Sequence, residues 1–196
     1  MFWKALRPLL EEDAKALKEF DQVRDGFEQD MDKQIQKMWA AKLGLKEYNS
    51  NLFEELSQLM INSKVDYTIF FRELSHIPSD LSALKKSFYI QTSQQIDEQW
   101  QSWLQSWRNI VLNNGNSTET SKIMKLTNPK YTWREWLIAP AYQQAEEGNY
   151  SLVKELQEVL SHPYNEQSKE IEDKYYRLKP KAFFNAGGIS HYSCSS

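Results

Sequence analysis

The sequence Asn128-Pro129-Lys130-Tyr131 opens the stretch that decides the fold, which continues to the chain end at Ser193-Cys194-Ser195-Ser196. Pro129 disfavours a helical conformation at the residue before it, and asparagine is itself common in turns. We therefore predict a turn at residues 128–131 with a helix after it. The stretch also contains Cys194, the only cysteine of the chain, so an internal disulfide is impossible.

Two helices are predicted after this turn. Apolar residues recur at three- and four-residue spacing from Tyr131 onward, and Gly148 ends the first helix at a position that favours a left-handed residue. Asn149 or Ser151 can cap the second helix, which ends at the His-Pro-Tyr sequence of residues 162–164. The first part of the stretch is therefore expected to be helical.

The order of these features resembles the C-terminal part of the selenoprotein O family, whose members are kinase-like proteins that transfer adenosine monophosphate (AMP) to other proteins. Two positions depart from the family pattern: Asn149 stands where the family usually has aspartate, and Lys179-Pro180 stands where a Pro-Pro pair is common. The segments that carry the resemblance are Ala41–Leu45, Val65–Thr68, Phe71-Arg72, Asn128–Tyr131, Arg134, Ala145–Asn149, His162–Tyr164, Tyr175-Tyr176 and Ser193–Ser196.

The resemblance implies an enzyme whose kinase-like core would precede residue 1. Such a parent uses ATP and Mg²⁺ to place AMP on protein hydroxyl groups, so its partners would be that upstream domain and the substrate proteins. Position 194 is cysteine or selenocysteine in the family, which implies a regulatory redox link from Cys194 to a cysteine of the core. The family also implies a cytoplasmic location in bacteria and a mitochondrial one in eukaryotes.

The composition favours an all-α fold. Helix-forming residues are plentiful, whereas the chain has only six glycines and six prolines. We predict a helical domain over residues 1–176, which would pack against the core, and a tail over residues 177–196. The tail contains Arg177, Lys179 and Lys181 and no acidic side chain. It could approach nucleotide phosphates or an acidic partner, or it could be a solvated tail.

The clearest helix of the sequence lies at residues 96–111. A row of tryptophans could stack on bases or sugars, but so regular a stripe is typical of a helix that faces the core. Each indole ring can also bury on the order of 200 Å² there. We therefore predict a core helix. Its apolar positions are Ile96, Trp100, Trp103, Leu104, Trp107, Ile110 and Val111.

Two helical segments are predicted before residue 45. The first covers residues 2–20, and in the resembling family it would lead out of the core, so its apolar face is expected to be half of an interface. A new helix is predicted to begin after Gly26 and to end at Gly44. Its apolar face includes Phe27 and Met31.

Shorter helices are predicted in the middle of the chain. Asp66 is expected to cap a helix over residues 66–74, and Ser117 or Thr118 is expected to cap one that runs to residue 126. Further helices are predicted at residues 49–60 and, inside a loop region at 75–95, near residues 81–88.

Motifs for chemistry are missing from the sequence. It has no glycine-rich phosphate loop and no His-Arg-Asp or Asp-Phe-Gly triplet, so we expect this chain alone to hold no ATP, metal or catalytic site. His76, His162 and His191 lie far apart without metal-ligand spacing. The formal charge of −3 and the lack of a long apolar run indicate neither nucleic acid nor a membrane as a partner.

Asn128, Pro129, Tyr131 and Arg134 are the candidate structural or interface residues. Arg134 could bridge to the upstream domain or to a substrate protein. Alternatively, it could pair with a carboxylate such as Glu135 or with a neighbour across the fold, which is the interpretation that we favour. For the whole chain, we consider two hypotheses. It is the C-terminal part of such an enzyme, or it is a freestanding helical interaction module without catalysis, as a split or decayed gene would produce.

Overall fold

The computed structural model describes residues 2–113 and 115–184, and within them every regular element is a helix apart from one isolated bridge between Val65 and Phe88. This confirms the predicted all-α fold. The α-helices are α1 (Phe2–Leu6), α2 (Ala14–Lys42), α3 (Ser50–Ser63), α4 (Tyr67–Leu74), α5 (Gln94–Asn113), α6 (Ser117–Thr127), α7 (Glu135–Glu146), α8 (Ser151–Ser161) and α9 (Lys169–Tyr175). The 3₁₀ helices are η1 (Arg7–Leu10), η2 (Leu81–Ser87) and η3 (Lys181–Phe183).

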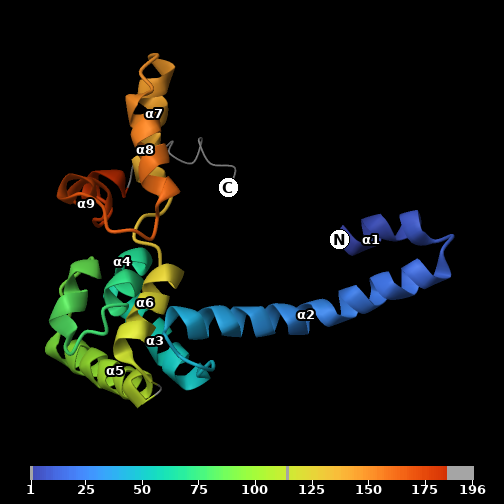
Figure 1. Cartoon of the computed structure of the whole chain (residues 1–196), viewed down its shortest axis with the longest axis horizontal. Coiled ribbons are helices and arrows are strands. Elements are labelled where there is room, and N and C mark those ends of the chain that lie inside the picture. The colour runs from blue at the N-terminus through green and yellow to red at the C-terminus, as the bar shows by residue number, and fades with distance from the viewer. Residues whose placement is uncertain (1, 114, 185–196) are drawn as a thin grey trace.

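The helices form two packed groups and one projecting helix (Figure 1). Helices α3 to α6 gather around the C-terminal end of α2, and the paired helices α7 and α8 lie on the other side of α4 and α6 with α9 nearby. The rest of α2 extends away from both groups, and α1 turns back at its far end. There the Trp3 ring lies 5.0 Å from the Phe20 ring, and Arg7 pairs with Asp21 at 2.5 Å.

The prediction that a new helix begins after Gly26 is wrong, because α2 runs unbroken from Ala14 to Lys42. Its start lies at Asp13, whose carboxylate accepts hydrogen bonds from the backbone N–H groups of Lys15 and Ala16. A glycine inside a helix costs only about 1 kcal/mol relative to alanine, and the good helix formers around it outweigh that cost. The predicted end at Gly44 is confirmed, with a φ of +66° there.

Five apolar side chains of α2 are exposed on one side of the projecting helix. Their spacing of three or four residues places them on one face, and between 43% and 60% of each residue is accessible to solvent. We call this set the α2 stripe. Its members are Val23, Phe27, Met31, Ile35 and Met38.

The larger core is built around α5, which confirms the interpretation of the tryptophan row. Trp100, Trp103 and Trp107 are almost completely buried, and each indole N–H donates a hydrogen bond. In the order of the three tryptophans, the acceptors are the Ser63 hydroxyl at 2.8 Å, the Leu52 carbonyl oxygen at 2.9 Å and the Leu43 carbonyl oxygen at 2.8 Å. Buried indoles with satisfied N–H groups stabilise the fold through area and through hydrogen bonding.

A second, smaller core joins α7, α8 and α9 to one face of α4. Helix α7 begins at Glu135 rather than near Tyr131, because residues 128–134 form a bend and an irregular segment in which the Tyr131 side chain is buried. Helix α4 separates the two cores, with Ile69 in the second and Phe70 in the first. The members of the second core are Ile69, Tyr131, Ala141, Leu156, Val159, Tyr175 and Tyr176.

The predicted helix ends are largely confirmed. Asp66 caps α4 by accepting from the Ile69 N–H at 3.0 Å, and Gly148 follows α7 with a φ of +82°. Helix α8 begins at Ser151, whose N–H donates to the Asn149 side chain. The cap predicted for α6 is one residue off, because Asn116 takes that role in place of Ser117 or Thr118.

The described part of the tail packs against α7 and against the segment after η2. The Arg177 guanidinium lies 5.2 Å from the centre of the Trp136 ring, and the Lys179 N–H donates to the Tyr89 hydroxyl at 3.1 Å. Cys194 and His191 lie outside the described residues. Within the described ranges, no helix has the length and apolar character needed to cross a bilayer.

Candidate functional site

The turn at Asn128 connects the two cores, and its asparagine is completely buried. The side-chain oxygen accepts from the Lys42 Nζ at 2.9 Å, and the amide nitrogen donates to the Lys42 carbonyl at 2.9 Å and to the Ser75 hydroxyl at 3.2 Å. One side chain therefore links the end of α2 to the end of α4. The residues it joins are 86 and 53 positions away in sequence.

Lys42 is a buried ammonium group that makes no ion pair among the described residues. Its Nζ lies 4.9 Å from the centre of the Tyr67 ring and 4.8 Å from that of Phe71. Burial lowers the pKa of Lys42. The asparagine oxygen and the two ring faces therefore provide its stabilisation in the described part of the chain.

A second polar cluster surrounds Glu166 on the other side of the turn. Arg72 Nη2 lies 2.5 Å from one carboxylate oxygen, and Lys130 Nζ lies 2.5 Å from the other. Lys130 also contacts Glu172 at 3.0 Å, and Arg72 donates to the carbonyl oxygen of Lys125. Both cations are almost fully buried, so Glu166 and its neighbours neutralise two charges that would otherwise be costly.

Glu166→Gln is expected to flatten the acid dependence of stability. Burial raises the pKa of the Glu166 carboxyl, but hydrogen bonds from Lys130 and Arg72 outweigh it and lower the pKa to about 2. Because the unfolded value is about 4.3, the ionised carboxylate contributes stability above that pH, and this contribution is lost as the pH falls toward 2. We expect this contribution to the free energy of unfolding to be on the order of 1 kcal/mol, because 56% of the Glu166 side chain is exposed and solvent screens its ion pairs.

Urea unfolding at pH 7 and pH 3 measures this effect. The unchanged chain should lose about 1 kcal/mol more than Glu166→Gln between these two pH values. Glu170→Gln, a change at an exposed carboxylate of α9, should behave like the unchanged chain. An equal loss in Glu166→Gln and the unchanged chain would contradict the role given to the cluster.

Arg134 pairs with Asp66 across the fold rather than with Glu135. Its Nη1 and Nη2 lie 2.6 Å and 2.8 Å from the two carboxylate oxygens, in a two-pronged geometry. The same carboxylate caps α4 and accepts from the Tyr89 hydroxyl at 3.0 Å. Arg134 therefore fixes the segment after the turn to the start of α4.

The backbone of the turn is held by a third contact. The N–H groups of Lys130 and Tyr131 both donate to the Pro163 carbonyl, at 2.8 Å and 3.1 Å. Pro129 borders a cavity of about 50 Å³ beside Lys42. Several segments far apart in the sequence thus meet here. They are Ala41–Leu45, Val65–Thr68, Phe71-Arg72, Asn128–Tyr131 and His162–Tyr164.

The polar groups of this junction bind one another, so its role is structural. We call it the clamp. Arg72 and Lys130 are occupied by Glu166, and Arg134 is occupied by Asp66. No group of three or more potential metal ligands occurs in residues 2–113 and 115–184. The hydrogen bonds and ion pairs hold the two groups of helices in a fixed relation.

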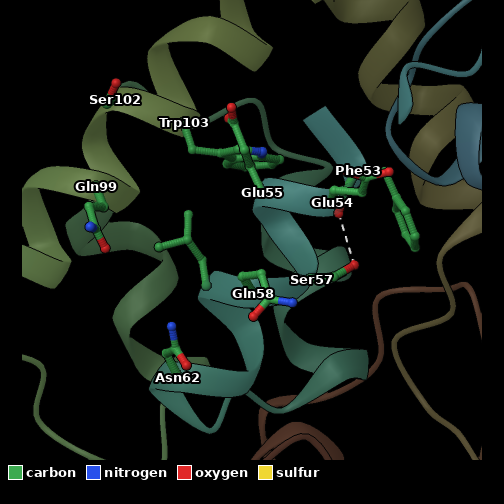
Figure 2. A pocket seen from close by; sticks show the side chains of 10 residues that line it. Phe53, Glu54, Glu55, Ser57, Gln58, Asn62, Gln99, Ser102 and Trp103 are labelled. Carbon is green, nitrogen blue, oxygen red and sulfur yellow. Dashed lines mark hydrogen bonds between the residues drawn. The ribbon is translucent and has the colours of Figure 1, made fainter. Parts of the chain in front are cut away.

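A further cavity lies away from this junction, in the groove between α3 and α5 (Figure 2). It measures about 990 Å³ and is open, and polar side chains from both helices surround it. Phe53, Leu59 and Trp103 provide its apolar part. None of the residues singled out from the sequence as structural or interface candidates lines it. The acidic pair there is Glu54 and Glu55, which are exposed residues of α3.

A family model described as Protein adenylyltransferase SelO matches residues 1–161. The chain belongs to the SelO family. This confirms the resemblance that the turn and its companion segments indicated. The residues that meet around Asn128 therefore lie largely within the part of the chain that matches the SelO family.

Curated SelO-family relatives carry the name Protein nucleotidyltransferase YdiU. The relative from Aromatoleum aromaticum is 31% identical in an alignment of 173 positions, which covers 84% of this chain and 33% of the relative. The relative from Tolumonas auensis is 33% identical in an alignment of 178 positions, which covers 87% of this chain and 34% of the relative. The relative from Vibrio parahaemolyticus is 31% identical in a gapped alignment of 202 positions, which covers 98% of this chain and 38% of the relative. The chain thus spans about a third of the length of these relatives.

Three charged residues of the junction were not predicted from the sequence, namely Lys42, Arg72 and Glu166. Lys42 and Arg72 lie in segments that carry the family resemblance, which was the available signal, but their partners could not be read from spacing. Glu166 gave no signal at all, because an isolated glutamate in a polar segment usually faces solvent.

Proposed function

We propose that this chain is the C-terminal helical part of a SelO-family protein nucleotidyltransferase and that it braces an upstream kinase-like core. In this proposal the core takes ATP and Mg²⁺ and transfers AMP to hydroxyl groups of substrate proteins. Membership of the SelO family and the name of the relatives support the nucleotidyltransferase class. AMP as the transferred group is supported by the description of the family as a protein adenylyltransferase.

The α2 stripe is the observation that carries the bracing role. Five apolar side chains in a row on a projecting helix form a surface that a protein normally covers. About two thirds of each curated relative lies outside the matched region, so such relatives contain enough additional chain to cover it. Burial of one such side chain contributes roughly 1.5–3 kcal/mol, and five of them would make a stable contact.

Regulation through Cys194 is a further part of the proposal, supported by the family resemblance of the last four residues. A peroxide would convert the thiols of Cys194 and a core cysteine into a disulfide: the S–S bond forms, the peroxide O–O bond breaks, and the two electrons and two thiol protons pass to the peroxide oxygens. Mass spectrometry of the longer protein after peroxide treatment tests this step. A thiol that stays reduced under those conditions would exclude it.

The bracing role is tested in a chimera in which this chain replaces the matching third of the Tolumonas auensis relative. We expect the chimera to transfer labelled AMP from ATP to protein, and the relative without that third to lose at least 90% of its activity. The 196-residue chain alone should transfer none. Transfer by the chain alone, or equal activity of the truncated relative, would contradict the proposal.

Met31→Glu in the chimera tests the surface itself. A charge in the middle of the α2 stripe should lower AMP transfer at least ten-fold, because the charge would be buried in an apolar contact. Gln36→Glu adds the same charge on the opposite face of α2 and should leave the activity within two-fold. Equal effects of the two changes would contradict docking through the stripe.

The alternative is a freestanding helical module whose α2 stripe binds a different protein. The exposure of the stripe also fits this alternative, because a separate protein could cover the same apolar face. A chimera that folds, as judged by circular dichroism, but transfers no AMP would support this alternative.

A further inference from the structure

A cavity of about 280 Å³ lies between α5, the start of α6 and the segment after α4. It is separate from the Asn128 junction and from the α2 stripe. Arg108 lines it from α5, His76 lines it from the segment after α4, and the first two turns of α6 contribute three hydroxyl groups. These hydroxyls belong to Ser117, Thr118 and Ser121.

Arg108 is the arginine of the described residues that makes neither an ion pair nor a hydrogen bond. Its Nε is completely buried without a hydrogen-bond partner. The other arginines have partners: four contact carboxylates, and Arg177 donates to a carbonyl oxygen and lies over a ring. A guanidinium keeps its charge at any physiological pH and has five N–H donors. The buried Nε without an acceptor is an unfavourable feature, and the two Nη groups, which make no hydrogen bond to the described residues, are available to an anion in the cavity.

The remaining lining of the cavity also suits an anion. No carboxylate lines it, whereas an imidazole and three hydroxyls offer further hydrogen bonds. Ser121 donates its hydroxyl hydrogen to the Ser75 carbonyl at 2.6 Å, but Ser117 and Thr118 can donate into the cavity. Burial is the main cause that lowers the pKa of His76, and the positive charge of Lys125 lowers it further, so the imidazole serves as a neutral hydrogen-bonding group.

The size and the apolar wall narrow the class of anion. Ile77 and Leu112 cover one part of the lining, and the volume exceeds what a bare phosphate ion needs. A planar guanidinium binds two phosphate oxygens at once, and hydroxyl groups are good partners for the third. We infer that this cavity binds the phosphate group of a small phosphate monoester, with Arg108 as its charged anchor.

Titration calorimetry of the full 196-residue chain with inorganic phosphate and with AMP tests this site. Arg108→Gln should weaken binding of both at least ten-fold, and Arg24→Gln, on the projecting part of α2, should leave it within two-fold. A concentration of either ligand about 100 times its Kd should raise the thermal midpoint of the unchanged chain by about 5 °C. The midpoint of Arg108→Gln should stay constant on addition of ligand.

The stability of the ligand-free variants gives an independent check. Arg108→Gln without ligand should be at least as stable as the unchanged chain, since it removes an unpaired cation. His76→Asn, which changes another lining residue, gives a second variant and should weaken binding several-fold. Tighter binding of AMP than of phosphate would assign the apolar wall to the ester group, and equal binding would assign the site to the phosphate alone. Binding unaffected by Arg108→Gln, no binding at millimolar phosphate, or adenosine binding as tightly as AMP would overturn the inference.

Discussion

Asn128→Ala is expected to lower the free energy of unfolding by about 3–5 kcal/mol. The substitution removes three buried hydrogen bonds, two of them with Lys42 and one with Ser75. It also leaves the buried Lys42 ammonium without the oxygen that accepts its hydrogen bond in the described structure. Urea unfolding measures the loss, and the fluorescence of the buried tryptophans of α5 reports the transition.

Two controls separate the clamp from simple truncation. Thr127→Ala shortens the preceding side chain, whose hydroxyl bonds to an exposed carbonyl, and should cost under about 1 kcal/mol. The double change Lys42→Met with Asn128→Ala should cost about 1–3 kcal/mol less than the sum of the single changes, because the lost contact is shared. An Asn128→Ala cost below about 1 kcal/mol, or strict additivity, would refute the clamp.

Gly44→Ala is expected to cost about 2–4 kcal/mol. With a φ of +66°, the backbone of Gly44 lies in the left-handed region, where a side chain costs about 1–2 kcal/mol. A Cβ there would also lie 2.6 Å from the Met124 sulfur and 2.8 Å from the Thr120 methyl carbon. Met124 is fully buried in the larger core, so it cannot move aside without cost.

Gly148→Ala is the matched control for this prediction. Gly148 has a φ of +82° but nothing within 4 Å of the position of a Cβ. It should therefore show the backbone cost alone, about 1 kcal/mol. Equal effects at the two glycines would show that the close approach of α2 and α6 at Gly44 is not part of the folded state.

The sequence predicts those parts of the fold that depend on neighbours along the chain. The tryptophan row, the cap at Asp66 and the end at Gly148 follow from local periodicity and turn chemistry, and all are confirmed. Gly26 misled the prediction because a glycine is a weak helix breaker when strong helix formers surround it. Local rules thus identify helices better than they identify where one long helix continues.

The contacts of the Asn128 junction could not be predicted, for a physical reason. Lys42 and Asn128 are 86 residues apart, and Arg134 and Asp66 are 68 apart. Their pairing depends on how helices pack, which no local spacing determines. The family resemblance pointed to the right segments, whereas the partner of each charge emerges only from the structure.

The exposure of the α2 stripe could also not be predicted from the sequence. A face such as that of Phe27 and Met31 is typical of a helix that packs on a core, and periodicity alone does not say which core. In the structure these side chains remain exposed on the projecting helix α2. This difference is what makes the stripe informative about a covering partner.

Hydrogen exchange along α2 tests the docking of this helix on an upstream core most directly. Amide exchange should be compared between the isolated chain and the chimera with the Tolumonas auensis relative. If the stripe is covered in the chimera, amides over residues 23–38 should exchange at least ten-fold more slowly there than in the isolated chain. The same exchange rates in both proteins would contradict the bracing role and leave α2 without an upstream partner.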